Sequence, residues 1–526
     1  MTENVYDVAI VGGGMSGLFS GWRLATNDLE NSNKLLPLAQ ARESGKLRVG
    51  VFERSHRVGG RLESITPPGM PGHIAEVGGM RFMNTQRLVS NLIGELGLIT
   101  MPFPVGSPDN IYYLRGHHFR DRDFGSSAKI PYHLNWHEDG KTPGEIILDA
   151  ITQVVPGAVE LNQAQWRKLK KTLTFNGEYL YNLGFWNLLL QVISSEAYHL
   201  CKDAGGYFST LSNWNAADAL PWYLADFGPD VQYNTIQGGM EQLPQSLASR
   251  FTQAGGELHT CLTLKRFDRE ADGGLMRLTF DSGETVRAHH LILAMPRRSL
   301  ELIAQDNGFL DAPELCYLIP TVTPNPMFKL FLCFDYPWWE LAGVRGGRST
   351  TDLPIRQTYY VSQLAAESGS ANPAMRRALM MASYDDGSCV GFWEGLEDED
   401  WRTRLDCDAP EMTPWERHSA PPVMVAEARR QLRELHDIEV VPQPYAAAFK
   451  DWREDPFGGA WNSWNVRVKS WEVRERMLQP LPDWPVHIVG EAYSESQGWV
   501  EGALQTAEEL LEEKFNLERP DWLSWA

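Results

Sequence analysis

Short, mostly apolar runs recur along the chain, each flanked by polar or turn-forming residues. They lie at residues 8–11, 47–52, 290–294 and 486–491. A run of this length is typical of a strand buried on both faces of a parallel sheet. Because the runs lie at the start, the middle and the end of the chain, we expect one sheet assembled from three distant pieces, with other material inserted between them.

Two inserted regions carry different patterns. Residues 143–224 have apolar positions at helical spacing, which predicts a helical subdomain. Its expected helices cover residues 145–154, 163–173, 183–200 and 216–224. Farther on, strand patterns recur at residues 327–334, 357–361 and 379–384, and a helix is predicted near 422–435.

The first apolar run leads directly into Gly12-x-Gly14-x-x-Gly17 and then into a helical pattern. In such a turn Gly12 permits the tight bend, Gly14 lets a pyrophosphate approach the backbone, and Gly17 lets helix and strand pack closely. The second run ends at Glu53, an acid placed to bind ribose hydroxyls, and a polar insertion at residues 27–46 accounts for its distance from the glycines. The pattern predicts a dinucleotide site.

Two further segments extend this prediction. Residues 54–61 combine three arginines with Gly59-Gly60 directly after the ribose acid, which favours phosphate contact. Gly78-Gly79 lets the backbone approach a planar ring, and Arg81 follows two residues later.

Length, charge and cysteine content narrow the class of protein. At 526 residues the chain should form two or three joined domains. The net charge of −20 argues against nucleic acid or an anionic membrane as partner. No apolar run approaches the roughly 18 residues of a membrane span, and we expect no signal peptide before the first strand. The six cysteines lack CxxC spacing and fit reduced, mostly buried thiols, so we expect a cytoplasmic protein. We expect no metal site.

Five motifs in one order resemble the flavin-dependent amine oxidase family. They are GGGMSG at 12–17, ERSHRVGGR at 53–61, EVGGMRF at 76–82, IQGGMEQLP at 236–244 and GE…GWVEGAL at 490–504. Within that family the chain is most similar to the L-amino acid oxidases, because TTDLPIRQTYY at 350–360 ends in an aromatic pair. The resemblance covers nearly the whole chain.

The resemblance implies an α/β fold with three parts. A Rossmann-type FAD-binding domain of discontinuous segments would comprise residues 1–75, 235–325 and 451–526. A mixed-sheet substrate-binding domain would comprise residues 76–130 and 326–450, and an inserted helical subdomain residues 131–234. FAD would be bound without a covalent link, and family members often form homo-oligomers.

The resemblance also assigns cofactor contacts along the flavin adenine dinucleotide. Glu53 would hold the adenosine ribose, Arg61 would face the pyrophosphate, and Glu491 would hold the ribityl chain. The N-terminus of the last helix would point at the flavin and stabilise negative charge there. The full set of expected contacts is Gly12, Gly14, Met15, Ser16, Gly17, Glu53, Arg54, Gly60, Arg61, Gly79, Met80, Arg81, Leu264, Glu491, Gly498, Trp499 and Val500.

Four residues match the family's catalytic set. Arg81 would grip the substrate carboxylate with its planar fork, and Tyr360 would add a hydroxyl donor, with Tyr359 as the alternative. Lys329 would hold a water near flavin N5 unless its strand lies at an exposed edge, and Trp499 would form one wall. The implied reaction is hydride transfer from the α carbon of an L-amino acid to flavin N5. Molecular oxygen then yields hydrogen peroxide, and hydrolysis of the imine yields ammonia and a 2-oxo acid.

Several alternatives stay open at the level of sequence. Glu495 is either a solvent-exposed loop acid or a contact for a cationic side chain, while the tryptophans would favour aromatic or bulky apolar side chains. Trp461 and Trp464 are either core residues or support for the Trp499 wall. The activity itself has three rivals: an amino acid 2-monooxygenase, an amine or polyamine oxidase, and a flavoprotein without enzymatic activity.

Overall fold

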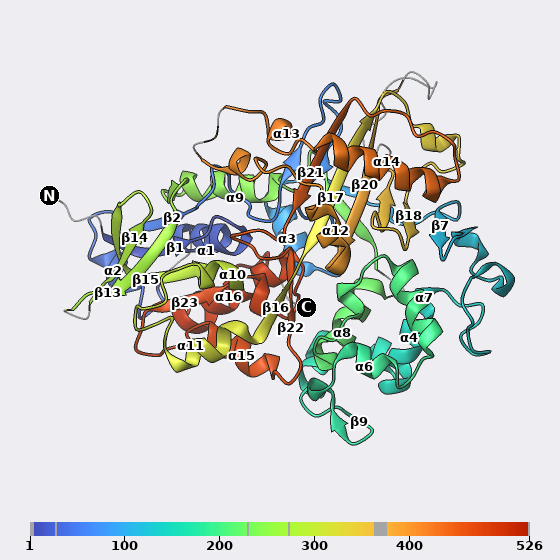
Figure 1. The fold of residues 1–526 in the computed structure, drawn as a ribbon. Coiled ribbons are helices and arrows are strands. Elements are labelled where there is room, and N and C mark those ends of the chain that lie inside the picture. Colours follow the sequence, from blue (N-terminus) through green and yellow to red (C-terminus); the bar gives the residue numbers. More distant parts are fainter. Residues whose placement is uncertain are drawn as a thin grey trace.

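The computed structural model describes residues 5–26, 29–228, 231–271, 274–361, 376–407, 409 and 411–523. Figure 1 shows a sheet with its helices on the left, a second sheet at the upper right and a group of helices at the lower right. Within the described residues each of the two large sheets has seven strands. The N-terminal and C-terminal segments both belong to the left-hand part, so the chain leaves this region and returns to it.

The first sheet is built from the distant apolar runs. Its order is β12-β2-β1-β15-β14-β13, and β23 pairs with the second half of β15. The strands are β1 Val5–Val11, β2 Val49–Phe52, β12 Glu257–His259, β13 Leu264–Arg269, β14 Met276–Phe280, β15 Thr285–Ala294 and β23 Val486–Val489. The pairs β1–β2, β1–β15, β2–β12 and β15–β23 are parallel, whereas β13 and β14 are antiparallel. The prediction of a parallel core joined from the start, middle and end of the chain is confirmed.

Helices cover both faces of this sheet. On one face α1 (Met15–Thr26) packs against α9 (Gln242–Gln253) and α16 (Val500–Phe515) through a large apolar cluster. On the other face the apolar cluster includes residues of α10 Arg297–Glu301, α11 Pro313–Leu318 and α15 Ser470–Met477. A Cβ on Gly17 would collide with the carbonyl oxygen of Gly12, so the glycine is needed for the close helix–strand contact that the motif predicts.

The second sheet is mixed. Its order is β21-β17-β20-β19-β18-β7-β8, antiparallel except for β18 and β7. The strands are β7 Ile111–Leu114, β8 His117–Arg120, β17 Met327–Phe334, β18 Arg348–Thr351, β19 Gln357–Tyr359, β20 Ala378–Asp386 and β21 Ala446–Asp451. Helices α12 (Val390–Glu394) and α14 (Pro422–His436) share one apolar cluster with it. The predicted strands of residues 327–334 and 379–384 therefore lie next to each other inside the sheet.

The helical region has its own apolar core. Its helices are α4 Pro143–Val154, α5 Gln163–Leu169, α6 Phe185–Leu189, α7 Ser195–Gly205 and α8 Ala216–Phe227. The prediction of one helix over 183–200 is wrong, because α6 ends and α7 begins within it. The Ser194 side chain accepts a hydrogen bond from the backbone N–H of Ala197 and so caps the N-terminus of α7.

Smaller elements complete the chain. The remaining helices are α2 Leu36–Gln40, α3 Arg87–Glu95 and α13 Pro414–Arg417. The remaining strands are β3 Ser64–Ile65, β4 Ala75–Glu76, β5 Phe82–Met83, β6 Thr100–Pro102, β9 Thr174–Phe175, β10 Glu178–Tyr179, β11 Tyr233–Ile236, β16 Val322–Asn325 and β22 Trp461–Trp464. Helix α2 lies in the predicted polar insertion, of which residues 27 and 28 are outside the described residues. No described helix is both long and apolar enough to cross a membrane.

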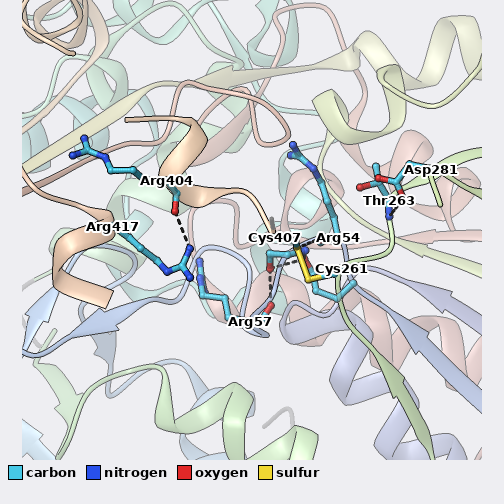
Figure 2. The surroundings of a disulfide bond; sticks show 10 residues. Arg54, Arg57, Cys261, Thr263, Asp281, Arg404, Cys407 and Arg417 are labelled. Atoms are coloured by element: carbon cyan, nitrogen blue, oxygen red, sulfur yellow. Dashed lines mark hydrogen bonds between the residues drawn. A yellow bond between two sulfur atoms is a disulfide. The ribbon is translucent and has the colours of Figure 1, made fainter. Parts of the chain in front are cut away.

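The expectation of six reduced thiols is wrong for two of them. Cys261 and Cys407 form a disulfide across 146 positions of sequence, with their Cα atoms 5.9 Å apart. Figure 2 shows the bond beside the backbone of Arg54, in the loop that follows β2. The N–H of Cys261 donates to the carbonyl of Ser55, so the disulfide lies next to the loop that follows Glu53. Spacing along the chain gives no sign of a pair this far apart.

The other four cysteines are free. Cys201 and Cys333 are buried and Cys389 is half-buried, as expected, whereas Cys316 is exposed.

Candidate active site

A cavity of about 500 Å³ lies where the first sheet, the second sheet and helix α8 meet. Its wall includes the turn after β1, the loops after β2 and β23, the Gly78–Arg81 segment, and side chains of β17, β20 and α8. This volume is typical of a small-molecule site. Four of the five motifs, at 12–17, 53–61, 76–82 and 490–504, thus contribute to one cavity, whereas residues 236–244 do not line it.

One end of the cavity is the predicted dinucleotide turn. Gly12, Gly14, Met15 and Ser16 line it, as do Arg54, Gly60 and Leu264. A Cβ on Gly14 would meet no atom within 4 Å, so the backbone there is open to a ligand. Gly17 does not line the cavity, and its role is the packing described above.

Glu53 is held at the edge of this end. Its Oε2 accepts the N–H of Gly13 at 2.6 Å, and its Oε1 accepts the N–H of Ser55 at 2.8 Å. Two backbone N–H groups, one in the glycine turn after β1 and one in the loop after β2, therefore fix the carboxylate. Glu53 itself lines the cavity.

Glu491 organises the middle of the cavity. Its Oε2 accepts Arg61 Nη1 at 2.8 Å, and its Oε1 accepts the N–H groups of Asn462 at 2.8 Å and Gly498 at 2.7 Å. One carboxylate thus ties the arginine expected at the pyrophosphate to the loop that carries Gly498 and Trp499. All of these residues except Asn462 line the cavity.

Helix α16 begins at the cavity. It starts at Val500, a cavity residue. The carboxylate of Glu501 accepts the N–H groups of Leu88 and Val89 and so caps α3. The N-terminus of α16, which carries partial positive charge, therefore lies at the cavity wall, where it would stabilise negative charge on a bound group.

Lys329 lies on β17, between β21 and β20, and is 4% exposed. The exposed-edge alternative is therefore wrong. Its Nζ donates to the carbonyl oxygen of Glu76 at 2.9 Å and to that of Gly78. Burial lowers the pKa of Lys329 to about 7. The residue lines the cavity and carries a proton that it can lose near neutral pH.

Arg81 is a half-buried cation that forms no ion pair with any acid of the described residues. Its Nη1 donates to the hydroxyl of Tyr359 at 3.2 Å and its Nη2 to that of Tyr207 at 3.3 Å. The guanidinium lies over the ring of Tyr233, 4.4 Å from its centroid. A guanidinium stays charged in proteins, so this wall of the cavity offers a positive charge to an anionic ligand.

The tyrosine beside Arg81 is Tyr359, and the prediction of Tyr360 is wrong. The hydroxyl of Tyr360 bonds Ser349 at 2.7 Å and His436 at 2.8 Å, within the core beneath α14. Neighbouring residues of a strand point to opposite faces, so only one of the pair can face Arg81. Burial raises the pKa of Tyr359, but the guanidinium groups of Arg81 and Arg348 outweigh it and hold that pKa at about 8.

Tryptophans form much of the remaining wall. The Nε1–H of Trp499 donates to Oδ2 of Asp226 at 2.8 Å. The ring of Trp461 stacks on that of Trp222 with centroids 5.5 Å apart, and both rings line the cavity. Trp464 lies in the apolar core behind the sheet and does not. Of the two tryptophans left open by sequence, only Trp461 supports the wall.

Both readings of Glu495 are wrong. Its side chain is 9% exposed and lies outside the cavity. It pairs with Arg167 of α5 and Arg474 of α15, each at 2.5 Å, and lies 3.8 Å from Lys170. Burial raises the pKa of Glu495, but these three cations outweigh it and lower that pKa to about 2. The residue joins the helical region to the first domain.

Sequence reasoning missed several cavity residues, among them Tyr207, Asp226, Tyr233 and Tyr384. Tyr384 pairs in register with Lys329 across β20 and β17, a relation that no linear pattern contains. Asp226 carried a usable sign, because it is an acid among aromatic residues just after the helix predicted over 216–224. Within the described residues, no group of three or more His, Cys, Asp or Glu could hold a metal ion.

Comparisons with known proteins identify a matching family, relatives in sequence and solved structures of the same fold. The family described as flavin containing amine oxidoreductase matches residues 15–509. Aplysianin-A of Aplysia kurodai is 26% identical over 98% of this chain and 91% of its own length. L-amino acid oxidase bordonein-L of Crotalus durissus terrificus is 26% identical over 68% of this chain and 64% of its own length. A putrescine oxidase structure bound to putrescine shares the fold, with a TM-score of 0.65, 18% identity and coverage of 97% of this chain and 99% of that one.

Proposed function

The chain belongs to the family of flavin-containing amine oxidoreductases, and we propose that it is an FAD-dependent L-amino acid oxidase. It would convert an L-amino acid into a 2-oxo acid with release of ammonia and hydrogen peroxide. The observation that carries the proposal is Arg81, a guanidinium that lines the cavity without an acidic partner among the described residues. The substrate of an amine oxidase has no carboxylate, so such an enzyme would not need this positive charge.

The residues present fit FAD along the whole cavity. The open backbone at Gly14 and the N-terminus of α1 suit a pyrophosphate. Glu53 suits a ribose, and the N-terminus of α16 suits the electron-rich edge of a flavin. When bound, the flavin supplies a two-electron acceptor for a hydride, and molecular oxygen regenerates it with formation of hydrogen peroxide.

The chain's own residues would bind and orient the substrate. Arg81 would bind the substrate carboxylate bidentately, with the hydroxyls of Tyr359 and Tyr207 at its side. This grip fixes the α carbon and its hydrogen relative to the cofactor, so most of the catalytic gain comes from orientation. The rings of Trp461 and Trp499, which line the cavity, would exclude water from the reacting centre.

Lys329 would serve the proton transfers. With a pKa of about 7 its Nζ can give or take a proton near neutral pH. The two carbonyl oxygens of Glu76 and Gly78 hold it in the cavity wall.

The test is a substrate panel on the purified holoprotein. An absorption spectrum establishes the flavin, and peroxide, ammonia and 2-oxo acid are then measured for the twenty amino acids in both enantiomers. Putrescine, spermidine and the decarboxylated amines serve as controls. Equal yields of peroxide and ammonia from L-amino acids alone support the proposal. Oxidation confined to amines, or carbon dioxide with an amide product, contradicts it.

A further inference from the structure

Asp226 is an acidic residue of the cavity wall that contacts Trp499. It lies in the last turn of α8, is 3% exposed and lines the cavity. Its Oδ2 accepts the Nε1–H of Trp499, and its main-chain oxygen accepts the hydroxyl of Tyr233. None of the described Lys, Arg or His side chains forms an ion pair with it. The carboxyl group is fixed in place but has no counter-ion.

Its surroundings favour a cation. The rings of Trp222, Phe227, Tyr233 and Trp499 line the cavity around it, and aromatic faces attract cationic groups. The C-terminal end of a helix carries partial negative charge, and Asp226 lies at that end of α8. Burial raises the pKa of Asp226 well above its ordinary range, whereas the hydrogen bond from Trp499 and the charge of Arg81 lower it. A cation beside the carboxyl group would favour its ionised form.

The cavity wall therefore carries a cation, Arg81, and an acid, Asp226, and neither forms an ion pair within the described residues. Tyr233 connects them, since its ring lies under the guanidinium of Arg81 and its hydroxyl bonds the backbone of Asp226. A ligand that bears a carboxylate at one point and a cation at another would satisfy both.

We propose that Asp226 is the counter-ion for the cationic side chain of a basic L-amino acid, lysine or arginine. The inference rests on the proposed function and names the substrate class of that site. The reacting α-amine is a poor partner for Asp226, because it must be neutral to release a hydride and a neighbouring carboxylate would keep it protonated. The side-chain ammonium or guanidinium takes no part in the reaction and can remain charged.

The test compares L-lysine with L-norleucine, which has the same carbon chain without the ammonium group. Asp226→Asn keeps the side-chain volume and the acceptor for Trp499 while it removes the charge. We expect kcat/KM for L-lysine to fall by about 30-fold or more, in the range for loss of one partner of a buried charge pair. The value for L-norleucine should change less than about threefold. Asp149→Asn, at an exposed acid of α4, is the matched control for net charge and should leave both unchanged.

Three results would overturn the inference: an equal loss for both substrates, which would place the α-amine at Asp226; no loss for either; and a wild-type preference for L-norleucine. The last comparison needs no variant, so it holds even if Asp226→Asn does not fold or bind flavin. If the wild type oxidises L-norleucine but not L-lysine, only this inference falls. If it oxidises no amino acid, the proposed function falls as well.

Discussion

Replacement of Arg81 separates its charge from its geometry. Arg81→Met removes the cation and keeps an unbranched side chain, whereas Arg81→Lys keeps the charge and removes the planar fork. The described bonds use Nη1 and Nη2 once each, with hydroxyls at 3.2 and 3.3 Å. Because a guanidinium has more donors than these, the arginine retains N–H groups for a carboxylate.

The size of the effect follows from the bonds that are lost. A hydrogen bond to a charged group contributes about 1.5–3 kcal/mol, so a bidentate grip is worth about 3–6 kcal/mol in the transition state. Since about 1.36 kcal/mol is a factor of ten in rate, Arg81→Met should lower kcat/KM by about 10²–10⁴-fold. Arg81→Lys retains one such bond and should lose about 10–100-fold.

The assay pairs the best L-amino acid substrate with its decarboxylated amine, both followed by peroxide release from flavin-loaded protein. The losses should appear only for the amino acid, because the amine has no group for Arg81 to bind. Flavin content and thermal unfolding of each variant control for damage to the fold. A loss of the same size for both compounds would refute the carboxylate role and leave Arg81 a structural residue.

The other predictions concern Lys329, the tyrosine pair and Glu53. The pKa of Lys329 falls from 10.5 to about 7 on folding, so the unfolded state binds more protons between these pH values, and Lys329 destabilises the fold most below pH 7. In urea unfolding, Lys329→Met should therefore raise the free energy of unfolding more at pH 6.5 than at pH 9.5. An equal gain at both pH values would contradict the shift. Tyr359→Phe should raise KM. Tyr360→Phe should lower the free energy of unfolding by about 1–2 kcal/mol and leave kcat/KM unchanged. The reverse pattern would show that Tyr360, and not Tyr359, contacts the substrate. Glu53→Ala should lower the flavin-to-protein ratio after dialysis, and full retention would remove its ribose role.

Local patterns were sufficient for the parts of this protein that depend on neighbouring residues. The apolar run before Gly12 predicts its strand because burial on both faces requires apolar side chains throughout. The roles of the glycines follow from steric requirements. In the structure the backbone at Gly14 is open, and Gly17 leaves no room for a Cβ, as the motif predicts.

Features that depend on distant partners could not be derived in this way. Period-two alternation shows that Tyr359 and Tyr360 face opposite sides, but only the packing of distant segments shows that Tyr359 meets Arg81 and Tyr360 meets Ser349. Glu495 is an internal ion-pair residue only because α5 and α15 bring three cations to it. The Cys261–Cys407 bond has the same origin, since nothing near either residue indicates the other.

The place of β23 has a consequence for synthesis of the chain. Every other strand of the first sheet is complete by residue 294, yet β15 keeps a parallel edge that only residues 486–489 can cover. The loop and helix that follow, with Glu491, Gly498 and the start of α16, close the cavity last. A nascent polypeptide released before this point has most of its hydrophobic core but no finished cofactor site. Tight retention of flavin would therefore mark a chain that the ribosome has translated almost to its end.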